Sequence, residues 1–302
     1  MHDGNVLVQR PEFVAETQSK AFGVVEKPLT FWERLYGNSG VRKGALLVLL
    51  ALAWELYARK VNNPLVFPTF TATVEAFVRA FTSGVIPQRT WASIRLLLQG
   101  YAVGLVLAAL LTAFATASRL GTDLLETLTA MFNPLPSIAL LPLAVLWFGL
   151  GNNSLIFVLI HAVLWSVALN THAGFRSVSQ TLRMVGRNYG LGGVRYVFRI
   201  LIPAAFPNIL TGLKIGWAFA WRTLIAAELV FGVSQGSGGL GWYVFENKNL
   251  LEIANVFAGL FTVILIGLVV ENLIFRTIEQ RTIRRWGMQH WGLCGRQRAR
   301  PA

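Results

Sequence analysis

The sequence predicts an all-α protein that crosses a membrane several times. Only 14% of the 302 residues are charged, whereas 54% are hydrophobic, and the mean hydropathy is +0.54. A soluble protein carries about 25% charged residues, so this chain has too few charges to build a solvated surface. A disulfide-stapled scaffold is excluded because Cys294 is the only cysteine. The net charge of +13 fits either nucleic acid or an anionic membrane face, and the positions of the charges must decide between them.

Long runs without Asp, Glu, Lys or Arg locate the membrane-spanning helices. Such runs cover 23 residues at 96–118, 49 residues at 127–175 and 18 residues at 253–270. A helix needs about 20 apolar residues to cross the bilayer core, so the second run is long enough for two spans with a glycine-rich link between them. These runs predict four spans, at 96–118, 125–148, 154–173 and 254–274.

Two further segments are apolar but interrupted by charges. Residues 44–58 contain Glu55 and have a pair of basic residues at each end, a pattern typical of side chains that anchor a helix at the membrane interface. Residues 209–230 contain Lys214, Arg222 and Glu228. We expect both segments to cross the membrane, which gives six spans. The chain then divides into an N-terminal tail, a transmembrane domain and a basic C-terminal tail, at 1–43, 44–274 and 275–302.

The basic residues predict the orientation of the chain. Of the 27 Lys and Arg residues, 19 fall in four segments on one side of the six spans, namely 1–43, 119–123, 174–208 and the tail after 274. Only six fall on the other side. Cytoplasmic loops carry the excess of Lys and Arg, so both termini should be cytoplasmic. Topology therefore explains most of the net charge, and no nucleic acid is expected as a partner.

The longest loop on the predicted cytoplasmic side begins with an amphipathic helix. The loop contains five Arg and no Asp or Glu. Leu182, Val185 and Tyr189 recur at helical spacing on one face, while Arg183 and Arg187 are four residues apart on another. Such a helix suits docking to a protein partner. The alternative is a basic loop that lies on anionic lipid.

Glycines end this helix, and a second helical stretch follows it. Gly190, Gly192 and Gly193 break the first helix, which we expect over 181–191. The helical pattern resumes directly afterwards, and we expect the second stretch to end at Pro203.

The spacing of this loop carries a resemblance to a known family. Gly190 is followed by nine residues and then by Ile200-Leu201-Ile202-Pro203. The loop resembles the cytoplasmic loop of binding-protein-dependent ABC importer permeases, whose motif reads Glu-Ala-Ala, three residues, Gly, nine residues, then Ile-x-Leu-Pro. In this chain Met184-Val185-Gly186 occupy the Glu-Ala-Ala positions. The motif's acidic residue is therefore absent, which affects a polar contact but leaves the apolar helical surface unchanged.

Five further segments extend the resemblance to residues 40–288, nearly the whole chain. They are similar to the nitrate, sulfonate, taurine and bicarbonate branch of these permeases. The segments are 63–68, 133–136, 146–151, 220–228 and 238–241.

The resemblance implies a type I ABC importer permease fold with six transmembrane helices in a bacterial inner membrane. It implies the permease subunit of an importer for a small anionic solute, with ATP hydrolysed by a separate ATPase subunit. We therefore expect no enzymatic activity and no cofactor in this chain. The other implied partners are a periplasmic substrate-binding protein, a second permease copy and membrane lipid. The residues implied in coupling to the ATPase are Leu182, Met184, Val185, Gly186, Tyr189, Gly190, Ile200, Ile202 and Pro203.

Arg222 lies near the middle of its predicted span, where a charge costs at least about 2.5–3.5 kcal/mol. It should therefore face a cavity or a carboxylate. We name Arg222, Trp221, Glu228 and Pro136 as candidates for a substrate pathway. Pro136 is included because prolines loosen the backbone of the third span, and such spans often line cavities. The alternative is a structural ion pair between Arg222 and an acidic residue of another helix or of a partner copy.

Other functions and sites have less support from the sequence. An ion-gradient-driven secondary transporter is the alternative function, but no clear inverted repeat is visible. His161 and His172 lie eleven residues apart on one span and could form a proton or metal site, but neither has Cys, Asp or Glu at ligand spacing, so we expect no metal there. Residues 236–241 satisfy G-x-G-x-x-G but lie between two spans, which favours a turn near a substrate gate over a nucleotide site.

Overall fold

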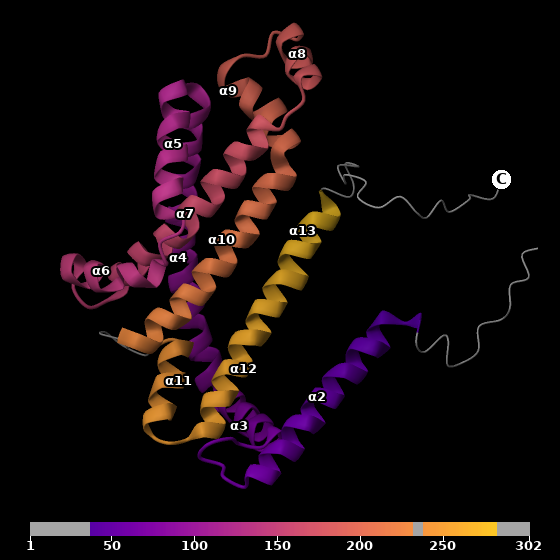
Figure 1. Cartoon of the computed structure of the whole chain (residues 1–302), viewed down its shortest axis with the longest axis vertical. Helices are drawn as coiled ribbons and strands as arrows, with labels where there is room; N and C mark the ends of the chain where they lie inside the picture. Colours follow the sequence, from indigo (N-terminus) through magenta and orange to yellow (C-terminus); the bar gives the residue numbers. More distant parts are fainter. Residues whose placement is uncertain (1–36, 232–237, 283–302) are drawn as a thin grey trace, which may run out of the picture. The chain divides into compact units, whose positions relative to one another are not determined.

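The structure, a computed structural model, describes residues 37–231 and 238–282, which form helices and contain no β-strand (Figure 1). The predicted all-α fold is therefore confirmed. The chain divides after Ala51 into two units, which we describe separately. Helix α2 (Ser39–Val61) crosses this division.

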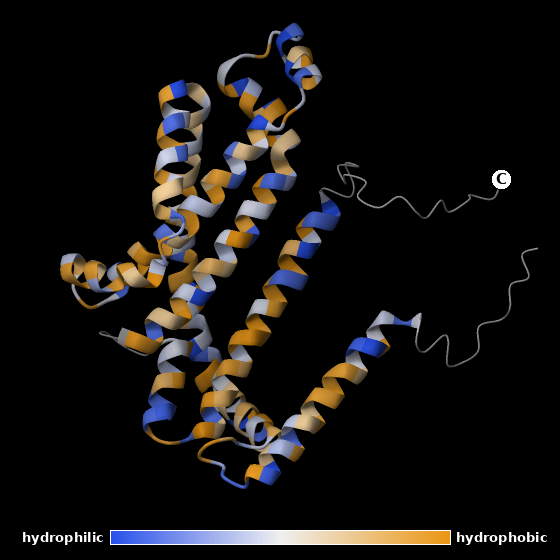
Figure 2. Ribbon diagram, in the orientation of Figure 1, coloured by the Kyte–Doolittle hydropathy of each residue, from blue (hydrophilic) through white to orange (hydrophobic). Residues whose placement is uncertain are grey.

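The described part of the first unit contains the beginning of α2. Residues 46–50 are Leu or Val, and each is at least 60% exposed. Orange marks this apolar stretch in Figure 2. A helix with apolar side chains all round needs apolar surroundings, which lipid or another chain supplies. The membrane span at 44–58 stays a prediction.

Four helices in the described residues are long and apolar enough to cross a membrane, and each overlaps one predicted span. Two of them are α4 (Val85–Ala117) and α7 (Asn152–Arg176). The other two, Gly193–Val230 and Ile253–Arg281, are each built from three helical segments. The first comprises α9 (Gly193–Tyr196), the π-helical turn η2 (Val197–Leu201) and α10 (Ile202–Phe231), and the second comprises α12 (Ile253–Val269), the π-helical turn η3 (Val270–Phe275) and α13 (Arg276–Arg281).

The segment expected to span at 125–148 is not one continuous helix. Helix α5 (Arg119–Phe132) ends before Pro134, and the chain resumes as the 3₁₀ turn η1 (Ser137–Leu140) and α6 (Leu141–Phe148). The chain bends by 88° between the helical segments Arg119–Phe132 and Ser137–Phe148. Pro134 and Pro136 have no N–H to continue the helical hydrogen bonds, so the backbone turns there. Taken as one broken span, the pair raises the number of candidate spans to five.

Helix α7 lies at the centre of the second unit and packs against α4 and α10. It contributes most of its length to the main hydrophobic core, including Leu159 and Val163. Gly100 and Gly104 of α4 face these two side chains. A Cβ atom at Gly100 would lie 2.6 Å from the Leu159 Cβ atom, so glycine allows the two helices to approach closely.

Two short helices lie beside these spans. Helix α3 (Phe70–Thr82) packs against α12, where the Phe77 and Phe261 rings are 5.5 Å apart edge to face. Thr69 caps α3 by accepting the Ala72 N–H at 3.2 Å. Helix α11 (Leu240–Asn249) contacts α12, α10 and α4. Helix α4 begins at Val85, eleven residues before the predicted span, because its polar first turns bind α10 and α11 through Arg89 and Ser93.

Candidate functional site

Helix α8 (Gln180–Asn188) occupies the position predicted for the first helix of the long loop. Its Ser179 cap accepts the Leu182 N–H at 3.3 Å. After the helix, Gly190 adopts the left-handed region with φ of 68°, the Gly190 N–H donates to Arg187 O and the Leu191 N–H donates to Gly186 O. These two bonds form a Schellman motif, which glycine accommodates best at the left-handed position.

The predicted coupling residues divide into an exposed group and an internal group. Leu182, Met184, Val185 and Tyr189 are 38%, 57%, 42% and 81% exposed, so α8 presents apolar side chains that no other part of the described chain covers. Gly186 is buried, although it lies four residues after Leu182 and three before Tyr189 on the same side of α8. A Cβ atom there would come 2.9 Å from the Tyr196 ring and 3.2 Å from Ile200.

Arg183 has a role that the sequence analysis missed. Its Nε donates to Val178 O at 3.1 Å and its Nη2 to Phe175 O at 2.6 Å. These carbonyls belong to the end of α7 and the turn after it, where helical carbonyls lack partners and a cation is favoured. Arg183 therefore ties α8 to α7. The sequence signal for this role was the position of Arg183, which follows the C-terminal end of the helix at 154–173 by about ten residues.

The prediction that the second helical stretch ends at Pro203 is wrong. The helix continues from Gly193 to Val230, with Ile202 and Pro203 in its first described α-helical turn after η2. The Ile202 N–H donates to Val197 O, five residues back. This wider π-helical turn makes room for a proline that cannot donate its own hydrogen bond. The loop is thus continuous with the helix that carries Arg222.

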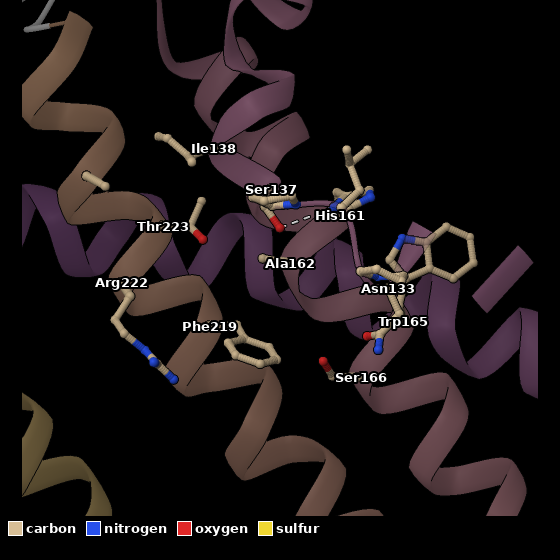
Figure 3. A pocket seen from close by; sticks show the side chains of 14 residues that line it. Asn133, Ser137, Ile138, His161, Ala162, Trp165, Ser166, Phe219, Arg222 and Thr223 are labelled. Atoms are coloured by element: carbon tan, nitrogen blue, oxygen red, sulfur yellow. Dashed lines mark hydrogen bonds between the residues drawn. The ribbon is translucent and has the colours of Figure 1, made fainter. Parts of the chain in front are cut away.

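A cavity of about 310 Å³ lies between the break at 133–138 and the helices α7 and α10 (Figure 3). It brings together three segments that are far apart in the sequence. Its lining residues are Asn133, Pro134, Leu135, Pro136, Ser137, Ile138, His161, Ala162, Trp165, Ser166, Phe219, Arg222, Thr223 and Ala226.

Arg222 supplies the positive charge at this cavity. Its Nε donates to Ala218 O at 3.0 Å, and its Cζ lies 5.2 Å from the centre of the Phe219 ring, a cation–π distance. Within residues 37–231 and 238–282, Arg222 forms no ion pair. The ion pair considered from the sequence is therefore not found in this part of the chain.

Polar side chains from the break and from α7 complete the lining. The His161 Nδ1 and Ser137 Oγ atoms are 3.1 Å apart, as the dashed line in Figure 3 shows. The buried His161 Nε2 has no hydrogen-bond partner in the described residues. Trp165 stacks on Phe132 at 5.3 Å. The sequence analysis considered His161 for a proton or metal site and did not place it in a cavity. No group of His, Cys, Asp or Glu within the described ranges is placed to hold a metal ion.

The four pathway candidates separate into two pairs. Pro136 and Arg222 both line the cavity. Trp221 instead lies in the core, where its Nε1 donates to Val263 O of α12 at 3.3 Å. Glu228 is 2% exposed and binds Ser93 and Gly241, so it lies outside the cavity lining.

Comparison with known proteins connects this geometry to a family. The model of the family described as binding-protein-dependent transport system inner membrane component matches residues 100–284. The taurine transport system permease protein TauC of Escherichia coli is 30% identical over 244 residues, which cover 79% of this chain and 86% of TauC. The aliphatic sulfonates transport permease protein SsuC of Escherichia coli is 28% identical, covering 80% of this chain and 90% of SsuC. The nitrate import permease protein NrtB of Synechocystis is 26% identical, covering 82% and 90%.

Proposed function

This chain belongs to the family of binding-protein-dependent transport system inner membrane components and is the permease subunit of an ABC importer, and on that premise we propose that it passes a small anionic solute along Arg222. The observation that carries this proposal is that Arg222, which forms no ion pair in the described residues, lines the cavity between the break at 133–138 and helices α7 and α10. An unpaired cation in a membrane segment is stabilised when an anion can approach it. The solute is of the nitrate, sulfonate or taurine type, as the relatives' names suggest, or of the bicarbonate type, which the sequence resemblance adds.

Helix α8 docks on the ATPase subunit through Leu182, Met184, Val185 and Tyr189. Their exposure supports this role, because apolar side chains gathered on one exposed helix favour a partner surface. ATP is hydrolysed in that partner, and this chain performs no chemistry. Arg183 and the continuous helix from Gly193 transmit the displacement of α8 to α7 and α10, between which the cavity lies. Transport then follows by alternating access.

The assembly contains two permease copies, a periplasmic substrate-binding protein and surrounding lipid. We place both termini in the cytoplasm and count six spans, with α2 as the first. The membrane domain covers 44–274, between the tails 1–43 and 275–302. The positive-inside distribution of Lys and Arg supports this orientation.

The test compares two substitutions of Arg222 in the complete transporter, reconstituted in liposomes with its ATPase and binding protein. Arg222→Gln should lower solute uptake by about tenfold or more, because it removes a charge-assisted hydrogen bond to the anion. Arg222→Lys keeps the charge and should retain part of the uptake. Arg79→Gln, in the exposed Arg79–Glu75 pair of α3, is the matched control and should transport normally.

Two results would contradict the proposal. Uptake by Arg222→Gln equal to that of the unmodified protein would exclude the anion pathway at this residue. Uptake that an ion gradient sustains without ATP would favour the secondary transporter instead.

A further inference from the structure

Glu228 is a buried carboxylate that connects three helices. It lies near the end of α10 and is 2% exposed. Ser93 of α4 lies with its Oγ 2.9 Å from both carboxylate oxygens and donates to the carboxylate. The Gly241 N–H of α11 donates to Oε2 at 2.8 Å. A buried carboxylate is stable only when such donors replace water. The donors from α4 and α11 therefore satisfy Glu228 in its buried position.

The donors on α11 are the first N–H groups of that helix. Its N-cap residue is Gly239, which has no side chain to accept them. The Leu240 N–H donates instead to Ser93 Oγ at 2.9 Å, and the Gly241 N–H donates to Glu228. Helix N-termini need such acceptors and favour a negative charge. Ser93 and Glu228 thus cap α11 from two other helices.

Glycine at the N-cap and at the second residue of α11 permits this close approach. A Cβ atom at Gly239 would lie 2.2 Å from both Glu228 Oε1 and Ser93 Oγ. A Cβ atom at Gly241 would lie 2.6 Å from Glu228 Cβ. Any other residue at either position would push α11 away from the carboxylate. The contact between Glu228 and α11 therefore requires glycine at both positions.

Arg89 adds a second connection between α4 and the same segment. Its Nη1 donates to Gly238 O and its Nη2 to Glu246 Oε2, both at 3.1 Å. Arg89 precedes Ser93 by one helical turn, so both side chains lie on the same face of α4. Helix α4 therefore holds the segment 238–246 at two points.

We propose that Glu228 is a positioning residue for transport, which caps α11 from α10 and makes α11 follow α10 when the transporter changes conformation. Glu228 lies six residues after Arg222 on the same helix. Movement of the arginine-bearing helix therefore carries α11 with it. This inference rests on the proposed transport function, but its structural part can be measured without transport.

The first experiment measures hydrogen–deuterium exchange of the complete transporter in lipid nanodiscs. Glu228→Ala should raise hydrogen exchange at the Leu240 and Gly241 amides by about tenfold or more. The Gly241 N–H loses its acceptor, and the Leu240 N–H loses the carboxylate that holds its own acceptor, Ser93, in place. Glu228→Gln keeps an acceptor oxygen without the charge and should give an intermediate increase. Ser93→Ala should match Glu228→Ala at Leu240. Exchange in 253–269 should not change, and Glu75→Gln on α3 serves as the control with no change at α11.

The second experiment separates positioning from simple loss of fold. Transport and ATP hydrolysis are measured in the same liposomes with saturating binding protein. A residue that only stabilises the fold would lower both rates in proportion, whereas loss of positioning should lower the solute moved per ATP, in the order unmodified, Glu228→Gln, Glu228→Ala.

Two outcomes would overturn the inference. One is unchanged exchange at Leu240 and Gly241 in both Glu228 variants. The other is raised exchange with an unchanged ratio of transport to hydrolysis. The proposed function fails separately, because normal uptake by Arg222→Gln would leave the exchange result intact.

Discussion

At the scale of single residues, glycine sets how closely the helices pack. Gly100 of α4 faces Leu159 of α7 in the main core, and an added Cβ atom would lie 2.6 Å from the Leu159 Cβ atom. Membrane helices gain their stability largely from this kind of close contact, since lipid supplies no hydrophobic force between them. The position therefore controls stability although it carries no chemistry.

We expect Gly100→Ala to destabilise the protein by about 1–3 kcal/mol through overpacking. The measurement is the melting temperature in detergent, which should fall. Gly44→Ala is the matched control, because nothing lies within 4 Å of a Cβ atom built there and alanine favours a helix. Equal melting temperatures for the two variants would contradict the packing argument.

Two of the glutamates inside predicted spans, Glu55 and Glu228, bind helix ends in the structure. Glu55 accepts the Thr71 N–H at 3.1 Å in the first turn of α3, and Glu228 accepts the Gly241 N–H in the first turn of α11. Both carboxylates thus cap a short helix that follows elsewhere in the chain. The sequence analysis named Glu228 as a pathway candidate, whereas the structure places it in this capping contact.

At the scale of elements, the turn after α8 fixes the direction in which its exposed face points. Gly190 and Gly192 both have open space where a Cβ atom would be built. They differ in backbone, since Gly190 has φ of 68° and Gly192 has φ of −135°. Only the first conformation is costly for other residues.

Gly190→Val should therefore impair the coupling of α8, whereas Gly192→Val should not. A β-branched residue at φ of 68° costs at least about 1–2 kcal/mol. The turn after α8 can relieve this strain only by breaking the two Schellman hydrogen bonds. We expect weaker co-purification of the ATPase subunit and lower uptake with Gly190→Val, at unchanged membrane insertion. Equal co-purification of the two variants would show that this turn does not position α8.

Local patterns predicted α8 well and the third span poorly. Helical spacing and a glycine stop are signals within about ten residues, and they located α8 to within a few residues. The break at 133–136 was marked by its prolines, but the 88° turn depends on what α5 and α6 pack against. The π-helical turn before Pro203 was likewise invisible, because proline usually ends a helix.

At the scale of the whole molecule, the orientation in the membrane is open to a direct test. Cys294 is the only cysteine, and it lies in the C-terminal tail outside the described residues. We expect a membrane-impermeant maleimide to label it only from the cytoplasmic side. In the Cys294→Ser background, Asn249→Cys, at the exposed end of α11, should be labelled only from the opposite side. Labelling of both thiols from one side would overturn the predicted topology.

Composition and charge-free runs in the sequence predicted by themselves an all-α membrane protein, and the resemblance carried by one loop and five further segments indicated an importer permease. These properties depend on residues close together in the sequence. The cavity at Arg222 and the capping of α11 by Ser93 and Glu228 were decided only by the tertiary structure. In an apolar helix every face is hydrophobic, so periodicity does not reveal which faces meet. The positions of its few charged residues become meaningful only when distant helices bring partners to them.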